Sequence, residues 1–225
     1  MSLESNPPSA NSPQWSHVLQ VRRQDTQRAM EAMARLGKAY WYPLYAYIRQ
    51  RGHSPEEARD LAHEFFARLL QNKTLSYMKR DCGKFRSFLL SAMNHFLTDE
   101  WRKGRWPKPA ARPEATPAAE KIFEQNWALA VLNVVYERLK REYHEAGNGD
   151  LFKAIKFSLT GRGEAVPYAE LAERLSMAED TVRASVHDLR RRFSEVLREE
   201  VASLVASPAE MEEELRCLFA SAPLE

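Results

Sequence analysis

The sequence has little of what disulfide-linked, zinc-binding or membrane-spanning proteins require. Its 225 residues include two cysteines, Cys82 and Cys217, which lie far apart and form no C-x-x-C pair. This spacing argues against a disulfide framework and a cysteine zinc site, and it fits a reducing compartment. No run approaches the roughly 20 apolar residues that span a bilayer, and the polar N-terminus lacks the apolar core of a signal peptide. We therefore expect a cytoplasmic protein without membrane partners.

Sequence signatures of common enzyme classes are also absent. His63-Glu64 begins an H-E-x-x-H motif, but Ala67 stands where the second histidine would be. No phosphate-binding glycine loop, dinucleotide-binding fingerprint or nucleophile elbow occurs, and the histidines do not cluster. Carboxylate pairs such as Glu56-Glu57 have the spacing of exposed helix faces. We predict no catalytic residues, no metal and no cofactor, and therefore no enzyme.

Glycine is scarce, and no stretch alternates β-branched with polar residues, so helices are expected throughout. Ser54 and Glu57 form a predicted capping box, with Pro55 at the first helical position. The helix that follows has apolar residues at the i, i+3, i+4 spacing of one helix face, namely Ala58, Leu61, Ala62, Phe65, Phe66, Leu69 and Leu70. A second predicted helix has the same spacing, with Phe85, Phe88, Leu89, Ala92, Phe96, Leu97 and Trp101. A weaker helical stretch over about 24–50 precedes them. These segments predict an N-terminal helical domain over 24–104.

Residues 104–118 contain four prolines and no apolar periodicity, which predicts a semi-extended linker. Helical period resumes over about 118–145, with an apolar side made by Leu129, Leu132, Val135 and Leu139, and Gly147-Asn148-Gly149 ends it. Ser207 and Glu210 form a second capping box that opens an acidic C-terminal helix. We predict an all-α fold of two small helical domains joined by a proline-rich linker, the second containing a helix-turn-helix. The predicted bounds are a disordered extension 1–23, domain 24–104, linker 105–118, domain 119–206 and helix 207–225.

Residues 168–193 have the pattern of a helix-turn-helix. Leu171 and Leu175 face inward on the first helix, Ala172 is small where two helices must cross, and Met177 fills the angle between them. Ser176 to Glu179 reads as a turn and a capping box for the second helix. Its apolar residues would leave Asp180, Thr181, Arg183, Ala184, Ser185 and His187 exposed at its start, where such motifs contact base edges, with Arg190, Arg191 and Arg192 beyond, suited to phosphates. The alternative is a plain helical hairpin with a solvated arginine face.

Basic residues are concentrated locally although the net charge is only +2. From Trp101 to Pro113 there is no acidic residue, and Lys79, Arg80, Lys84 and Arg86 flank a predicted loop over 72–84. The aromatic residues Tyr77 and Trp106 are interleaved with them. Cations beside exposed aromatic rings suit single-stranded or melted DNA, because phosphates need charge and unstacked bases need flat surfaces.

Three ordered segments resemble bacterial RNA polymerase sigma factors of the extracytoplasmic-function type, as a divergent branch. Residues 44–49 with 55–69, whose core is Asp60, Leu61 and Glu64, resemble the polymerase-binding region. Residues 85–90 with 99–103 resemble the helix that contacts the −10 element, and residues 168–175 with 180–183 resemble the −35-reading helix-turn-helix. His63 stands where the family usually has glutamine. Basic residues are common in the family where Ser185 and Asp188 fall here.

The resemblance implies a role for each segment. Core RNA polymerase would be bound by Asp60, Leu61, Glu64, Phe65 and Arg68. The −10 DNA would be contacted by Tyr77, Lys79, Arg80, Lys84, Arg86, Arg102 and Lys103. The −35 DNA would be contacted by Thr181, Arg183, Ala184, Ser185, His187, Arg190 and Arg191. The implied function is promoter recognition, melting and transcription initiation, with core polymerase and promoter DNA as partners and an anti-sigma or other regulatory protein as a further candidate.

Two alternatives remain open at this point. One is a stand-alone helix-turn-helix regulator that binds DNA without polymerase. The other is a sigma-like protein-interaction bundle that binds no promoter. Over residues 179–200 acidic residues outnumber the arginines, so the helix-turn-helix alone is expected to bind DNA weakly.

Overall fold

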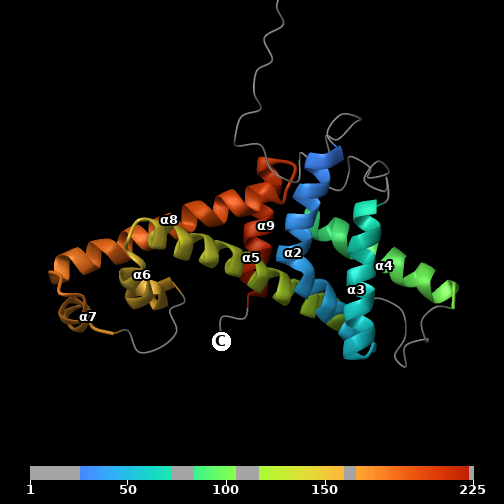
Figure 1. Cartoon of the computed structure of the whole chain (residues 1–225), viewed down its shortest axis with the longest axis horizontal. Coiled ribbons are helices and arrows are strands. Elements are labelled where there is room, and N and C mark those ends of the chain that lie inside the picture. Colours follow the sequence, from blue (N-terminus) through green and yellow to red (C-terminus); the bar gives the residue numbers. More distant parts are fainter. Residues whose placement is uncertain (1–25, 72–83, 105–116, 160–165, 223–225) are drawn as a thin grey trace, which may run out of the picture. The chain divides into compact units, whose positions relative to one another are not determined.

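The computed structural model describes residues 26–71, 84–104, 117–159 and 166–222 (Figure 1). The predicted all-α class is confirmed: these ranges hold no β-strand, only one isolated bridge between Lys84 and Val205. The helices are α2 (Thr26–Gln50), α3 (Pro55–Gln71), α4 (Phe85–Arg102), α5 (Pro117–Glu145), α6 (Gly149–Ile155), the 3₁₀ turn η2 (Lys156–Leu159), α7 (Tyr168–Leu175), α8 (Glu179–Ser203) and α9 (Pro208–Ser221). The predicted extension 1–23 and nearly all of the predicted linker lie outside the described residues.

Both predicted capping boxes are present. The Ser54 hydroxyl accepts the Glu57 backbone N–H at 3.2 Å, and the Glu57 carboxylate accepts the Ser54 N–H at 2.8 Å. Ser207 and Glu210 make the same reciprocal pair at the start of α9. The predicted stop of α5 is also confirmed, since Gly147 takes φ +76° and Asn148 donates its N–H to the Tyr143 carbonyl at 2.8 Å. Local hydrogen-bonding chemistry sets these helix ends.

Helix α2 is kinked at Tyr40, whose φ and ψ are −113° and 20°. Pro43 lies three residues later inside the helix. Its ring collides with the carbonyl four residues back and it has no N–H to donate, so the backbone before it departs from helical geometry. The Tyr40 side chain at this kink is fully buried.

The contacts divide the chain into two compact units. Unit 1 contains the described residues up to Ala130 together with Val201–Ala222, and unit 2 contains Val131–Glu200. The chain therefore passes between the units within α5 and again at the end of α8, whereas we expected the passage to lie in the proline-rich segment. The start of α5 belongs to unit 1 because its aromatic residues are part of that unit's core.

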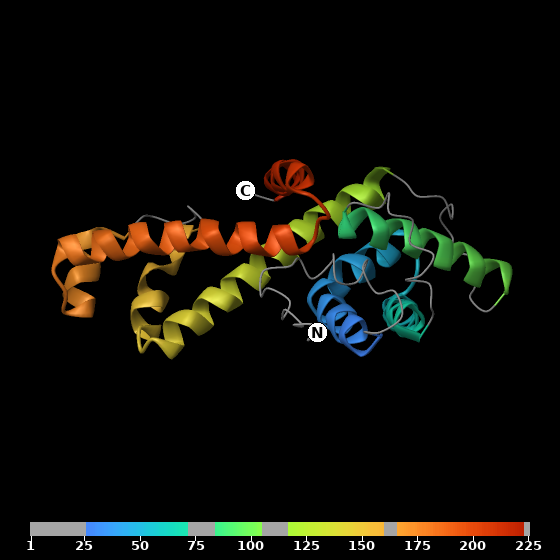
Figure 2. The ribbon, with the colours of Figure 1, turned by 90° about the horizontal axis from the view of Figure 1, so that it is seen from above.

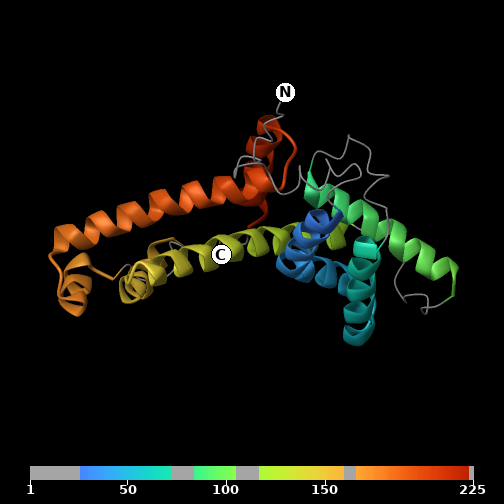
Figure 3. The same cartoon turned by 45° about the horizontal axis from the view of Figure 1, so that its top comes forward.

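The core of unit 1 is aromatic. Trp127 of α5 stacks on Tyr40 of α2 with ring centroids 4.4 Å apart, and Phe85 of α4 lies 5.9 Å from Trp127. Phe123 and Tyr47 meet edge to face at 6.1 Å. Such pairs add about 0.5–1.5 kcal/mol each beyond the burial of their area. This cluster joins α4 and the start of α5 to α2. Figure 3 shows the ribbons of these helices.

The core of unit 2 joins the second half of α5 to α6, α7 and α8. The buried residues are Val131, Val135, Leu139, Phe152, Ile155, Leu171, Ala172, Val182, Val186, Leu189, Val196 and Leu197. Phe152 of α6 lies between Tyr136 and Tyr143 of α5 at 5.5 and 5.4 Å. One expectation is wrong: Leu129, which we placed on the apolar side of this helix, is 46% exposed. The helical spacing of the apolar residues in α5 is correct, but which face of the helix is buried depends on the other elements that pack against it.

Candidate nucleic-acid interface

Most of the residues that the sequence pattern places on the inner faces of α7 and α8 are buried, whereas Leu175 and Met177 are half-buried. Leu171 and Ala172 on α7 and Val182, Val186 and Leu189 on α8 are all buried. Figure 2 shows α7 placed at the N-terminal end of α8. The packing leaves the outer face of the first turns of α8 exposed.

The turn between these helices is built differently from our expectation. Ser176 takes the left-handed conformation, with φ 52° and ψ 43°, and follows the last residue of α7. Met177 donates its N–H to the Ala172 carbonyl at 3.0 Å, which completes a C-terminal cap of α7. Helix α8 begins at Glu179, and Ala178 precedes it. Ser176 therefore caps the end of α7 and does not form the predicted capping box of α8, because an N-cap residue needs an extended backbone.

The predicted −35 residues form one surface at the start of α8. Thr181, Arg183, Ala184 and His187 are exposed, and Ser185 is half-buried, with its hydroxyl donating to the Thr181 carbonyl at 2.8 Å. Arg183 forms an ion pair with Glu179 at 2.9 Å and lies 5.6 Å above the ring of Tyr168. Exposed ion pairs of this kind are worth little, so the guanidinium can exchange its partner for a base edge.

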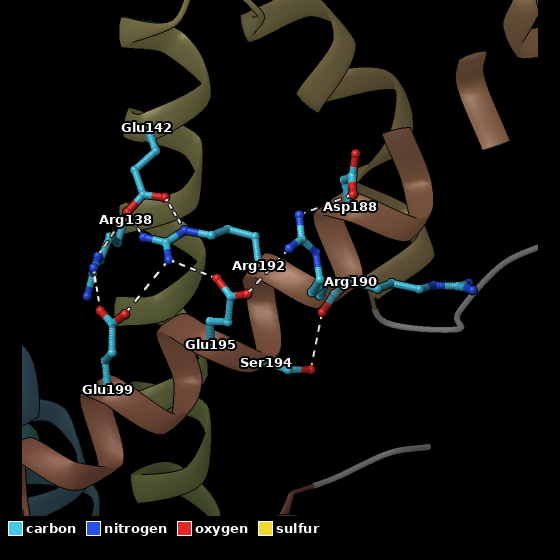
Figure 4. A network of polar contacts seen from close by, with 9 residues as sticks. Arg138, Glu142, Asp188, Arg190, Arg192, Ser194, Glu195 and Glu199 are labelled. Carbon is cyan, nitrogen blue, oxygen red and sulfur yellow. Dashed lines mark hydrogen bonds and ion pairs between the residues drawn. The ribbon is translucent and has the colours of Figure 1, made fainter. Parts of the chain in front are cut away.

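The three arginines that follow have different surroundings, and Figure 4 labels two of them, Arg190 and Arg192. Arg191 is 65% exposed and pairs with Asp188 at 3.3 Å, and Arg190 donates to the Ser158 carbonyl at 3.2 Å. Arg192 instead donates two hydrogen bonds to Glu142 of α5, and it also reaches Glu195 at 3.1 Å and Glu199 at 3.7 Å. These carboxylates raise the pKa of Arg192. Arg190 and Arg191 remain available to phosphates, whereas Arg192, which we also considered for that role, joins α8 to α5.

The predicted polymerase-binding residues on α3 separate into two groups. Asp60 is exposed and Glu64 is half-buried. Leu61 and Phe65 are 1% and 3% exposed and so support this surface from within the core instead of forming it. Arg68 pairs with Glu64 and donates to the buried Glu100 of α4 at 2.6 Å.

Those of the predicted −10 residues that the structure describes lie at the two ends of α4. Tyr77, Lys79 and Arg80 lie outside the described residues. Lys84 and Arg86 stand at the start of α4 and Arg102 and Lys103 at its end, which is roughly 24 Å away at the rise of an α-helix. Arg102 and Lys103 are exposed, and Lys103 contacts Glu100 at 3.2 Å.

The two basic residues at the start of α4 already have acidic partners. Arg86 donates to both oxygens of Glu214 on α9, from Nε at 2.9 Å and from Nη2 at 3.2 Å, and its Nη1 donates to Glu124 at 3.0 Å. Lys84 contacts Glu213 at 2.8 Å. Burial alone would lower the pKa of Arg86, but Glu214 and Glu124 outweigh it and the pKa is raised.

Sequence reasoning missed a buried polar cluster beneath α4. Arg51 is 5% exposed, and its Nη1 donates to the Tyr47 hydroxyl and to the Asn94 side-chain oxygen, both at 2.8 Å. The Tyr47 hydroxyl donates to the same Asn94 oxygen at 2.7 Å. Beside Asn94 lies a groove of about 410 Å³ between α4 and α5, lined among others by Arg86, Ser91 and His95. Asn94 thus belongs both to the polar cluster and to the lining of this groove.

Other kinds of site find no support in the described residues. No group of three or more histidine, cysteine, aspartate or glutamate side chains there could hold a metal ion. None of the described helices is long and apolar enough to cross a membrane. No protein-family model, curated protein or solved structure matches the chain.

Proposed function

We propose that this chain is a sigma factor that binds core RNA polymerase and directs promoter recognition, melting and transcription initiation. The observation that carries the proposal is the pair α7 and α8, whose packed inner faces hold Thr181, Arg183, Ala184 and His187 together on an exposed surface. Short polar and basic side chains at the start of a second helix are suited to base edges in the major groove.

The N-terminal half supports the same proposal. Helix α3 presents Asp60 and, in part, Glu64 on its surface, while the buried Leu61 and Phe65 hold the helix in place. Carboxylates on a helix that buried residues hold in place are suited to docking on a basic partner surface such as a polymerase subunit. Because acidic residues balance the arginines of α8, the −35 contact is weak alone and depends on this second attachment.

One observation favours the interaction-bundle alternative. Lys84 and Arg86, which the sigma-factor proposal assigns to the −10 DNA, are paired with acidic residues of the same chain. A bundle that binds a protein and no promoter would have no need of free cations at this position. A sigma factor would support synthesis of a promoter-dependent transcript, whereas an interaction bundle would not.

The experiment is to mix the purified chain with core RNA polymerase. We expect co-elution on gel filtration and promoter-dependent transcripts from a template library with randomised upstream sequence. Sequencing the 5′ ends of RNA after overexpression would then identify the promoter. Absence of both co-elution and transcripts would refute the sigma-factor proposal. Co-elution without transcripts would favour the interaction bundle, and DNA binding by a dimer without polymerase would favour the stand-alone regulator.

A further inference from the structure

The C-terminal helix α9 covers the basic residues at the start of α4. Its sequence, PAEMEEELRCLFAS, has four glutamates and one arginine. Glu213 and Glu214 are consecutive, and they contact Lys84 and Arg86 respectively. All four residues lie in unit 1, so this contact is part of one compact body.

The contact between Arg86 and Glu214 has the geometry with which arginine holds a phosphate. Two N–H groups of Arg86 donate to the two carboxylate oxygens of Glu214, and the third nitrogen donates to Glu124. Arginine recognises carboxylate and phosphate by the same two-pronged arrangement. Arg86 is 13% exposed, and its three side-chain nitrogens already donate to Glu214 and Glu124. A phosphate must therefore displace a carboxylate to take the same two-pronged position.

The chain holds α9 at this position by further contacts. Leu204, just before α9, accepts the backbone N–H of Phe85 at 2.9 Å, and Val205 forms the bridge with Lys84. Leu215 and Leu218 of α9 are buried. The exposed Glu213 contacts Lys84, whose hydrogen bond lowers the pKa of the Glu213 carboxyl. Apolar contacts therefore anchor the helix, and the glutamates set which cations it covers.

We propose that α9 is a built-in competitor of nucleic acid: its Glu213 and Glu214 occupy the places of two phosphates on Lys84 and Arg86, and the DNA strand must displace them. This inference rests on the proposed function, because it takes the start of α4 as a DNA-binding surface. It predicts that the chain alone binds promoter DNA poorly. Polymerase binding, or another event that loosens α9, would then allow Lys84 and Arg86 to contact DNA.

The first test changes charge and keeps shape. In Glu213→Gln/Glu214→Gln the side chains keep their size, so the apolar anchoring of α9 remains. The matched control is Glu120→Gln, an exposed glutamate of the same unit on α5 that makes the same change of charge per residue. The probe is a fluorescein-labelled single-stranded DNA of random sequence and about 20 nucleotides, titrated at low salt and followed by anisotropy.

We expect the double variant to bind this DNA about tenfold more tightly than the wild-type chain and the control to change by less than about twofold. Because Glu214 is buried and its substitution could disturb folding, Glu213→Gln alone is measured as well. Glu213 is 59% exposed, and its substitution should raise affinity about threefold with the circular dichroism melt unchanged. Affinity equal to wild type in both variants overturns the proposal.

The second test follows α9 itself. Cys217 lies on α9 and is half-buried, so in a Cys82→Ser chain it is the only thiol. If DNA displaces α9, saturating amounts of the same probe should raise the rate of Cys217 modification by an aromatic disulfide reagent about threefold or more. An unchanged or lower rate overturns the displacement. Neither assay contains polymerase, so these results are independent of the co-elution that decides the proposed function.

Discussion

Arg192 on α8 donates two hydrogen bonds to the carboxylate of Glu142 on α5, from Nε and Nη2, each at 2.9 Å (Figure 4). Hydrogen bonds from Arg192 are the largest of the causes that lower the pKa of the Glu142 carboxyl. The pair joins the two longest helices of unit 2 across a sequence separation of 50 residues. Arg192 therefore supports the surface on which Arg190 and Arg191 are presented.

Replacing Arg192 by alanine should lower the free energy of unfolding by about 1–2 kcal/mol, because a half-buried, two-pronged charge pair is lost. Urea unfolding followed by circular dichroism measures this change. Arg191→Ala is the control and should change stability by less than about 0.5 kcal/mol, since Arg191 is exposed. Equal effects of the two substitutions would show that the pair with Glu142 does not stabilise the unit.

Asn94→Ala should destabilise unit 1 by about 1–3 kcal/mol. The Asn94 oxygen accepts from both Arg51 and Tyr47, and its removal leaves a buried guanidinium and a hydroxyl without that acceptor. Thermal unfolding would detect this as a lower midpoint. The control is Thr98→Ala on the same helix, whose exposed hydroxyl donates only to a backbone carbonyl. A midpoint as high as that of the control would mean that Arg51 finds another partner.

Helix ends that depend on hydrogen bonds between residues close in sequence could be predicted. The capping boxes at Ser54 and Ser207 and the stop at Gly147 involve groups within a few residues, and all three are present. Ser176 fits the same sequence pattern, but its backbone is left-handed and it caps the preceding helix. The pattern gives the position of a helix end and does not distinguish the helix that ends from the one that begins.

Side-chain partners far apart in sequence could not be predicted. From the basic residues near it in the sequence, Arg86 is predicted to contact a DNA phosphate. The structure shows that its guanidinium is instead bonded to Glu214, which lies 128 residues later in the chain. Similarly, Leu129 has the helical spacing of a core residue, but its side chain is 46% exposed. Basic charge in a sequence shows where a polyanion could bind and cannot show whether an acidic segment of the chain is already there.

The buried Glu100 should make the stability of unit 1 depend on pH. Burial alone would raise the pKa of Glu100, but hydrogen bonds from Arg68 and Lys103 outweigh it and hold the pKa below its usual 4.5. A folded-state pKa below the unfolded value stabilises the protein above the unfolded pKa, and this contribution is lost as the pH falls through the folded value. Glu100→Gln should therefore be less stable at neutral pH and lose less stability on acidification. Urea midpoints measured from neutral pH to about pH 3 compare the two chains. Parallel pH curves would exclude Glu100 as the cause.

If the sigma-factor proposal holds, Asp60→Ala should weaken binding to core polymerase about tenfold without changing the unfolding midpoint. Asp60 is exposed on α3, and the loss of one charge at a docking surface weakens association with a basic partner. Asp99→Ala, an exposed aspartate on α4, is the matched control. Affinity is measured by competition for core polymerase with a labelled wild-type chain. Equal affinities of both variants would move the docking surface away from α3.

Arg183→Ala should change the dependence of transcription on the −35 sequence by about 1–3 kcal/mol, if Arg183 makes a two-pronged contact with a base. Its ion pair with Glu179 and its contact with Tyr168 are both at the surface, so the variant should fold as the wild-type chain does. Arg174→Ala, an exposed arginine at the end of α7, removes the same charge away from the exposed start of α8. Transcript yields from promoters with each −35 position varied separate the two substitutions, since a phosphate contact weakens all promoters alike and a base contact weakens those that carry its base. An unchanged preference in Arg183→Ala would assign the reading of the −35 element to other residues of α8.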